Sequence, residues 1–225
     1  MQHLLILFFS ILFWTGSSET LQEEKVWSAE LNTSKNAVYL TDLEKQVILE
    51  LNKVRSNPKR FAEEYLEDLQ TAFDGKLFTY PGQDPVITRE GIVPLIECIK
   101  VLKESGSAPI LMPVQGLANA AAELVTDQQK HGGIGHITQK GLTPQKRIEK
   151  YGNWDICSAE DITYGSFEAR QIVIALLIDD GVPDRSHRKN ILNKCFHYAG
   201  TNYGKHPNYL SMCVIDYAGE YENLE

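Results

Sequence analysis

Histidines and acidic residues stand beside glycines and turn residues in the second half of the chain. They fall in three segments, GHITQKGLTPQKRIEKYG at 135–152, SAEDITYG at 158–165 and LLIDDGVPDRSHRKNIL at 176–192. Glycines and turns let the backbone approach closely and let side chains converge. Imidazoles and carboxylates brought together in this way could form a charge-assisted hydrogen-bonded network or hold a divalent metal ion.

Not every histidine is a candidate for such a site. His3 lies in an apolar N-terminal run, and His197 and His206 lie among strand-forming residues, where a packing or solvated role is the default. His131, His136 and His187 remain. A serine-hydrolase site is not indicated, because the chain contains no Gly-x-Ser-x-Gly elbow.

Composition excludes several classes of protein. The 225 residues include 22 Lys and Arg against 30 Asp and Glu, for a net charge of −8, and 43% are hydrophobic. These values are ordinary for a globular chain and exclude a low-complexity protein. The acidic balance argues against sequence-independent nucleic-acid binding and against a polybasic membrane anchor. The length favours one domain.

The N-terminus predicts the compartment. Residues 4–14 are apolar except for Ser10, and small or polar residues follow. This run is too short to span a bilayer as a helix, and it is typical of a signal peptide. We expect cleavage near Ser18, a secreted, extracellular protein without a transmembrane span, and a polar linker over 19–40. An uncleaved anchor and a buried first helix are the alternatives.

Secretion affects how the cysteines are interpreted. An oxidising compartment favours two disulfides among the four cysteines, which allow three pairings. Cys195 and Cys213 flank a predicted hairpin and form the preferred pair, which leaves Cys98 with Cys157. A single sequon predicts N-glycosylation at Asn32.

The periodicity of apolar residues predicts the helices and strands that position the motif histidines and acids. Apolar stripes with caps and stops predict helices over 41–57, 58–69, 90–103, 116–130 and 167–178, with a short helix inside 135–151. A long loop is expected over 73–89. Residues 196–204 and 208–217 predict a β-hairpin around Lys205-His206-Pro207. Helices on both sides of a terminal hairpin give an α+β sandwich.

Taken in order, the three segments resemble the CAP superfamily of cysteine-rich secretory proteins, antigen 5 and pathogenesis-related proteins. The pattern is Gly-His, Gly-x-Thr-Pro and Arg-Ile, then Ala-Glu-Asp-Ile, then Asp-Gly-Val-Pro before His-Arg-x-Asn-Ile. Leu51-Asn52-x-Val54-Arg55 is similar to the family's first helix. The His-Arg pair is closest to the bacterial-type branch. The resemblance covers 41–218, leaves 219–225 as a tail, and implies a three-layer α-β-α sandwich of the CAP (SCP) type.

The resemblance also implies a central cleft lined by two histidines and two acids. Carried over by motif, these are His136, Glu160 and His187, with Asp180 in the fourth position, where other branches have a Glu. His136 and His187 are then the candidate metal ligands. His131 competes with His136, although its position at a helix end favours a capping role. A hydrogen-bonded network without metal is the simpler alternative.

Three functions follow from this resemblance. The first is a secreted, non-enzymatic binding module for a sterol, another lipid, a different small ligand or an extracellular protein. It requires no cofactor, although a divalent cation such as zinc could bind reversibly. The second is a metal-dependent peptidase that uses His136, His187 and a bound water, with Glu160 as base. The third is a structural or adhesive protein.

The apolar faces of 90–103 and 116–130 could border a lipid groove, with ordinary core packing as the alternative. The same two interpretations, a groove lining or core packing, apply to the aromatic residues near the motifs, Tyr151, Trp154 and Tyr164.

Overall fold

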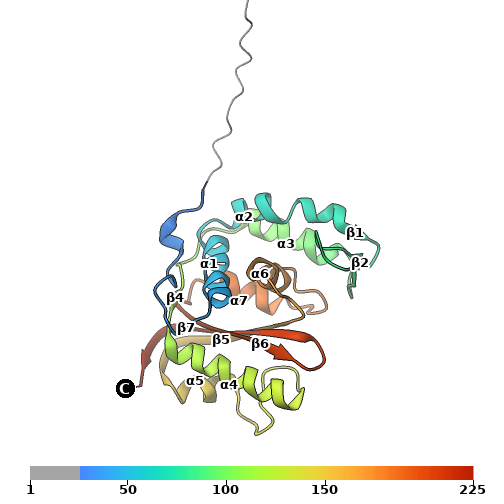
Figure 1. The fold of residues 1–225 in the computed structure, drawn as a ribbon. Helices are drawn as coiled ribbons and strands as arrows, with labels where there is room; N and C mark the ends of the chain where they lie inside the picture. The colour runs from blue at the N-terminus through green and yellow to red at the C-terminus, as the bar shows by residue number, and fades with distance from the viewer. Residues whose placement is uncertain (1–25, 225) are drawn as a thin grey trace, which may run out of the picture.

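The computed structural model describes residues 26–224, which form an α+β sandwich (Figure 1). The signal peptide predicted over 1–18 lies outside the described residues. The helical elements are η1 (Ala29–Leu31), α1 (Asp42–Ser56), α2 (Pro58–Tyr65), η2 (Asp68–Ala72), α3 (Val93–Glu104), α4 (Gln115–His131), α5 (Pro144–Glu149), α6 (Ala169–Ile178) and α7 (Ser186–Leu192). The strands are β1 (Phe73–Asp74), β2 (Leu77–Phe78), β3 (Val86–Ile87), β4 (Met112–Pro113), β5 (Gly152–Tyr164), β6 (Tyr198–His206) and β7 (Leu210–Asn223).

The central sheet has the strand order β4-β6-β7-β5. The predicted hairpin is confirmed as β6 and β7, which pair antiparallel from Tyr198↔Ala218 to His206↔Leu210. β7 continues to Asn223, so most of the predicted tail belongs to the sheet. β5 pairs along the other side of β7, with an irregularity between Asp155 and Ser158. This long edge strand was not predicted, because its central residues are polar and do not alternate with apolar ones.

Helices cover both faces of the sheet, as expected for three layers. In Figure 1, α4 and α5 lie below the sheet, and α1, α6 and α7 lie above it, with α2 and α3 outermost. The small residues of α4 permit a close approach to β6. A Cβ added at Gly200 would lie 2.0 Å from the backbone nitrogen of Ala118, so only glycine fits there.

Capping confirms the predicted start of the first helix. Thr41 accepts a hydrogen bond from the N–H of Glu44, and the Glu44 carboxylate accepts one from the N–H of Thr41, which is a capping box. Asn57 ends α1 and caps α2, and Pro58 occupies the first turn of α2. Across residues 26–224, the structure contains no helix that is long and apolar enough to cross a bilayer.

Two segments differ from the sequence expectation. Residues 26–40, expected as a polar linker, pack onto the domain, and Leu31, Ser34 and Leu40 are buried. The stretch 73–89, expected as a loop, contains the small antiparallel sheet β1-β2-β3. Strands of two residues leave too short an alternation to be recognised in sequence.

The predicted disulfide pairing is wrong. Cys157 is bonded to Cys195, while Cys98 and Cys213 are buried thiols whose pKa values burial raises to about 12. Cys213 faces Tyr203 in the middle of the hairpin, far along the strand from Cys195.

The register of the sheet explains the observed pair. Ala218 of β7 pairs with Ser158 on one side and Tyr198 on the other, which brings residues 157 and 195 to the same end of the sheet. The bridge passes over Gly219, where an added Cβ would lie 2.9 Å from the Cys157 sulfur.

Arg55 of α1 is fully buried and holds four backbone carbonyls from three segments. Its Nε donates to Pro109 O at 2.7 Å, and its Nη1 donates to Ile191 O and Asn193 O. Its Nη2 donates to Phe196 O at 2.6 Å. Burial lowers the pKa of Arg55 to about 10, so it stays charged at neutral pH. This guanidinium therefore ties α1 to α7 and to the start of β6.

We expect Arg55→Lys to lower the free energy of unfolding by about 2–4 kcal/mol, because one ammonium cannot serve four carbonyls in a fork geometry. Denaturant unfolding measures this loss. Arg60→Lys is the control, since Arg60 forms a surface pair with Glu64, and it should cost less than about 1 kcal/mol. Equal losses in the two variants would contradict the role assigned to Arg55.

Candidate functional site

His187 and Asp179 form one of two histidine–carboxylate pairs. Nδ1 of His187 lies 2.6 Å from Oδ1 of Asp179, and the His187 N–H donates to Oδ2 at 2.9 Å. Asp179 ends α6 in the left-handed conformation (φ 61°, ψ 41°), which Asp adopts more readily than most residues. The buried Asp179 carboxylate therefore meets the first turn of α7.

The environment of His187 favours its charged form. Burial opposes the imidazolium, but the hydrogen bond to Asp179 and the charges of Asp161, Asp179 and Asp184 outweigh burial and raise the pKa of His187. The His187 side chain is 16% exposed, against 1% for Asp179. The pair is thus an anchored carboxylate that presents an imidazole at a surface.

Asp180, which the resemblance placed in the cluster, is bonded elsewhere. Its carboxylate accepts hydrogen bonds from the backbone N–H groups of Arg89 at 2.7 Å and Glu90 at 2.8 Å. Asp180 does line the pocket beside His187, but the structure corrects its assignment as the acid beside the histidine, because Asp179 is the partner of His187. Both are aspartates at the end of one helix, and only the left-handed turn at residue 179 decides which of them faces α7.

Asp180 instead belongs to a cross-brace, formed by Asp180, Glu90 and Arg185, between the 73–90 segment and the loop after α6. Glu90 accepts a hydrogen bond from the Gly181 N–H at 2.7 Å and pairs with Arg185 at 2.7 Å. The hydrogen bonds from Arg185 and Gly181 lower the pKa of Glu90 to about 2. The cross-brace holds the β1–β3 segment beside the His187 pair.

His136 and Glu160 form the second pair, together with Arg147. Nδ1 of His136 lies 2.8 Å from Oε1 of Glu160, and Arg147 pairs with the other carboxylate oxygen. Arg147 also donates to His136 O at 2.8 Å and to Leu142 O at 3.1 Å. Glu160 and Arg147 are buried, whereas the His136 side chain is 46% exposed. Arg147 was not predicted as a site residue, although Arg-Ile was part of the family pattern.

The two pairs approach β5 from opposite faces of the sheet. Glu160 lies opposite Asp216 and bonds Arg147 of α5, below the sheet. The next residue, Asp161, points to the other face and accepts a hydrogen bond from Asn190 of α7 at 2.7 Å. The structure therefore brings His136 to Glu160 and His187 to Asp179, as two separate pairs beside one edge strand.

Buried carboxyls between the pairs were not predicted. Burial raises the pKa of Asp161 to about 7, although His187 and the hydrogen bond from Asn190 act in the opposite direction. Burial and the charge of Glu160 raise the pKa of Asp216. Glu160 acts in this direction because two like charges in one buried site repel each other. The only sequence signal for these residues is an acidic side chain inside a strand.

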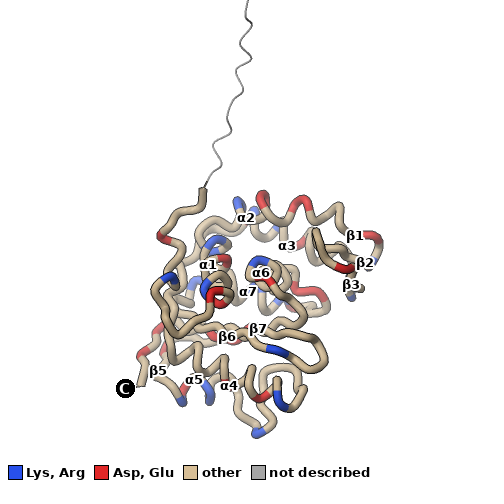
Figure 2. The backbone as a smooth tube through the Cα atoms, in the orientation of Figure 1, with Lys and Arg blue, Asp and Glu red and all other residues tan. Residues whose placement is uncertain are grey.

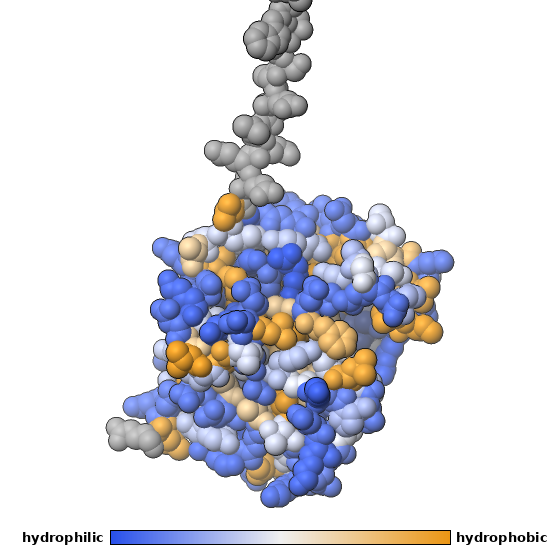
Figure 3. All heavy atoms as spheres, in the orientation of Figure 1, coloured by the Kyte–Doolittle hydropathy of each residue, from blue (hydrophilic) through white to orange (hydrophobic). Residues whose placement is uncertain are grey.

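A pocket with a cavity volume of about 590 Å³ opens beside the His187–Asp179 pair. His187 and Asp179 line it, whereas His136 and Glu160 are not part of its lining. Its apolar walls come from the β1–β3 segment, from β5 and from α6, and include Phe73, Phe78, Tyr80, Ile162, Tyr164 and Ile174. Figure 3 shows orange, hydrophobic surface beside a hollow at the right of the molecule.

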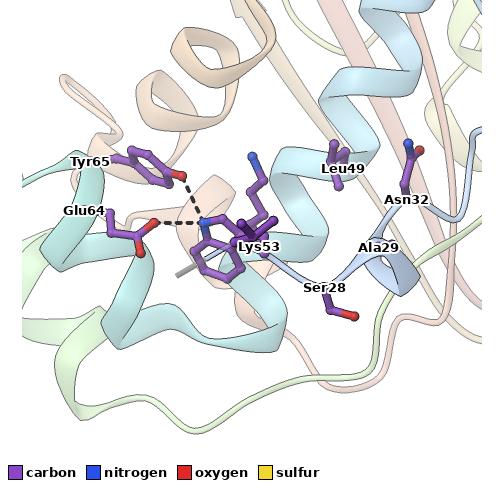
Figure 4. A pocket seen from close by; sticks show the side chains of 9 residues that line it. Ser28, Ala29, Asn32, Leu49, Lys53, Glu64 and Tyr65 are labelled. Atoms are coloured by element: carbon purple, nitrogen blue, oxygen red, sulfur yellow. Dashed lines mark hydrogen bonds between the residues drawn. The ribbon is translucent and has the colours of Figure 1, made fainter. Parts of the chain in front are cut away.

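A second depression, of about 660 Å³, lies between residues 26–32 and helices α1 and α2 (Figure 4). The Trp27 indole donates to Glu64 at 2.8 Å and to Tyr65 at 2.9 Å. None of the candidate histidines or motif acids lines this depression, and we do not assign it to the site.

The remaining candidate residues lie outside the two histidine–carboxylate pairs. His131 is exposed in the last turn of α4, and no contact joins it to Glu160 in the described part of the chain. His206 bonds Gly133 O at 2.8 Å, and His197 bonds Gly219 O at 3.1 Å. Trp154 and Tyr151 pack against the cluster around Leu117, whereas Tyr164 also lines the pocket.

The donor set does not fit a resident metal ion held by three protein ligands. Between residues 26 and 224, no group of three His, Cys, Asp or Glu side chains is arranged to hold one. Each carboxylate bonds Nδ1 of its histidine, which leaves only the two Nε2 atoms as possible ligands. Binding of zinc at His136 and His187 therefore stays a prediction, and no catalytic step is derived from it.

The three-layer α-β-α sandwich is the fold that the three ordered motifs predicted for a CAP-type domain. A family model described as the cysteine-rich secretory protein family, CAP, matches residues 50–217. The protein belongs to this family, which confirms the resemblance of the three motifs.

Two solved structures are similar to this chain at low sequence identity. An outer surface protein from Borrelia burgdorferi is 21% identical with a TM-score of 0.41, and the match covers 55% of this chain and 86% of that chain. An extracellular protein containing a SCP domain from Bacillus anthracis str. Ames is 17% identical with a TM-score of 0.39. That match covers 49% of this chain and 34% of the Bacillus chain, so this chain spans about a third of it. A search of curated proteins found no match.

We expect Asp179→Asn to lower the pKa of His187 below its wild-type value, because the amide keeps the shape but removes the negative charge. NMR titration of the ring measures this. Asp180→Asn is the matched control and should leave the His187 titration unchanged. A shift of equal size in both variants would contradict the assignment of Asp179.

The same variant tests a stability effect. Because the folded pKa of His187 is raised, its pair with Asp179 stabilises the fold below the unfolded pKa of roughly 6.5, and this contribution is lost as pH rises through the folded pKa. Asp179→Asn should cost about 1–3 kcal/mol in mild acid and less at alkaline pH, measured by denaturant unfolding. A cost independent of pH would show that the pair is not ionic.

Proposed function

We propose that the protein is a secreted, non-enzymatic binding module that holds a small hydrophobic ligand, such as a sterol or another lipid, in the pocket beside His187. The observation that carries this proposal is the 590 Å³ pocket with aromatic and aliphatic walls. Small-molecule sites are typically concave, mostly apolar and about 300–1,000 Å³, with a few polar groups that fix orientation.

The lining suggests how such a ligand would lie. Phe73, Phe78 and Tyr80 form an aromatic cluster with ring centroids 4.6 and 6.2 Å apart. His187 and Asp179 are the anchored polar groups of the same cavity. An amphipathic ligand would place its apolar body against the rings and a hydroxyl or carbonyl group toward the imidazole.

The groove expected between residues 90–103 and 116–130 does not provide this site. α3 and α4 lie in different layers, and the apolar stripe of each, which includes Leu95 and Leu102 of α3 and Leu117 and Leu124 of α4, is buried in the core, whereas Val93, Ile96 and Val101 of α3 are exposed. Core packing, the alternative interpretation of both faces, is therefore correct.

Several features support an extracellular location. The family is described as cysteine-rich secretory, and the chain contains a Cys157–Cys195 disulfide, which persists in oxidising compartments. Residues 4–14 have the apolar pattern of a signal peptide. Asn32 is partly exposed at the end of η1, and its glycosylation forms part of this proposal.

Filling the pocket tests ligand binding. Ala175 is exposed on α6 and lines the pocket, so Ala175→Trp should block it without disturbing the core. We expect saturable uptake of radiolabelled cholesterol or fatty acid by wild type and at least about a tenfold loss of affinity in the variant. Ala122→Trp, at a partly exposed position of α4 that lines another depression, is the control. No uptake by wild type, or equal uptake by both variants, would contradict the proposal.

The predicted alternative, a metal-dependent peptidase, has less support, because two imidazoles on separate pairs do not supply a three-ligand zinc site. A purely structural or adhesive protein would not need an open apolar pocket.

Metal analysis tests this choice. We expect zinc added to the purified protein to be removed by a chelator, because an ion with two protein ligands is weakly held. A stoichiometric ion that survives chelation in wild type and is absent from His136→Ala/His187→Ala would contradict this expectation and would favour the peptidase.

A further inference from the structure

Large apolar side chains are exposed on four segments that line the pocket or contact its lining residues. Ile87 of β3 is 83% exposed, and Leu210 at the β6–β7 turn is 71% exposed. Ile134 in the α4–α5 loop is 64% exposed, and Phe167 before α6 is 50% exposed. Isolated exposed apolar residues are ordinary, but several on neighbouring segments form an apolar surface, and such surfaces are typical of interaction sites.

Hydrogen bonds and ring contacts place these segments together. Gly135 donates to the Tyr164 hydroxyl, and the Tyr164 ring lies 5.2 Å from the ring of Tyr209. Ser211 donates to Ser166 O at 2.8 Å. Ile87 and Tyr209 both line the pocket. We name Ile87, Ile134, Phe167 and Leu210 the apolar rim.

The backbone at Leu210 is itself unusual. Leu210 has φ 68°, in the left-handed region, where a side chain other than Gly, Asn or Asp is uncommon. Glycine would relieve this strain and remove an exposed apolar group. The turn instead keeps a leucine that points away from the core.

The charged residues of the rim loops indicate which kind of partner the apolar rim can bind. The rim loops, residues 73–89, 133–141, 165–168 and 205–211, contain four Lys or Arg and three Asp or Glu, in a chain with a net charge of −8. Figure 2 shows both signs intermixed at this end. The excess negative charge of the protein therefore lies elsewhere, and this end can approach a neutral or anionic surface without strong repulsion.

We propose that the apolar rim docks on a phospholipid surface, so that the pocket mouth faces the membrane from which its ligand is taken. The choice of partner rests on the proposed function, because a water-insoluble ligand resides in membranes. Separate side chains on loop tips suit insertion into the headgroup region, where apolar groups penetrate about 5–10 Å. A protein partner would instead need a continuous complementary surface of about 1,000 Å² or more.

Sedimentation with phosphatidylcholine vesicles, with and without phosphatidylserine, tests the rim. We expect wild type to bind, and Ile87→Asp/Leu210→Asp to lose about tenfold or more in partitioning, because two apolar contacts are replaced by charges. Val38→Asp is the matched control, since Val38 is 94% exposed in the turn before α1, and it should bind like wild type. All three proteins are compared without residues 1–18, the predicted signal peptide, because its apolar run could itself bind vesicles and mask the rim.

Ala175→Trp separates this proposal from the proposed function. It blocks the pocket but leaves the rim intact, so it should lose ligand uptake and keep vesicle binding. Absence of wild-type binding to either vesicle, or equal binding by wild type and Ile87→Asp/Leu210→Asp, would overturn the docking proposal even where ligand uptake persists. Such a result would leave a protein partner for the rim.

Discussion

Buried guanidinium groups that hold backbone carbonyls are the interaction on which this site depends. Arg147 donates hydrogen bonds to two carbonyls of the loop that carries His136. Arg188 donates to the last carbonyls of α6, those of Leu177 at 2.6 Å and Ile178 at 2.9 Å. Arg55 bonds the end of α7, the helix that begins beside His187. A guanidinium has five fixed donors and keeps its charge when buried, so it can fix several loop carbonyls at once. Site loops that have little apolar contact of their own are thereby positioned by the core.

The geometry of the two pairs bears on metal binding. A carboxylate on Nδ1 orients each imidazole, as carboxylates do for histidines that bind metals. His136 and His187 nevertheless belong to pairs on opposite faces of β5, and within residues 26–224 they do not form a group of three ligands with another side chain. Of the two pairs, the His187 pair is the one that lines a cavity with apolar walls. The proposal of ligand binding therefore rests on that cavity, and zinc binding at His136 and His187 stays a prediction.

The sequence predicted those features that depend on local patterns. Helical periodicity located the main helices, the first of them begins where the sequence predicted, and the family pattern brought His136 to Glu160. The failures concern relations between distant segments. Asp179 and Asp180 are chemically identical, and only the left-handed end of α6 distinguishes them. The Cys157–Cys195 bond follows from the pairing of β5 and β6 with β7, which cysteine spacing does not encode. β5 was missed because two of its buried residues, Glu160 and Asp161, are acids, and the cost of burying them is offset by Arg147 and Asn190 rather than by apolar neighbours.

The two ends of the sheet differ in how they are held, and this difference bears on ligand entry. The Cys157–Cys195 disulfide closes the end where β5 begins, and it can be released only by reduction. At the other end, beside the pocket, the β1–β3 segment is held by the cross-brace of Asp180, Glu90 and Arg185. These contacts are hydrogen bonds and an ion pair rather than a covalent bridge, and Phe73, Phe78 and Tyr80 add packing against the core. A ligand of the proposed function would therefore enter at the end of the sheet away from the disulfide. The frame of His187 and Asp179 and the opposite pocket wall are thus held by different interactions, buried hydrogen bonds between α6 and α7 in the first case and aromatic packing with the cross-brace in the second.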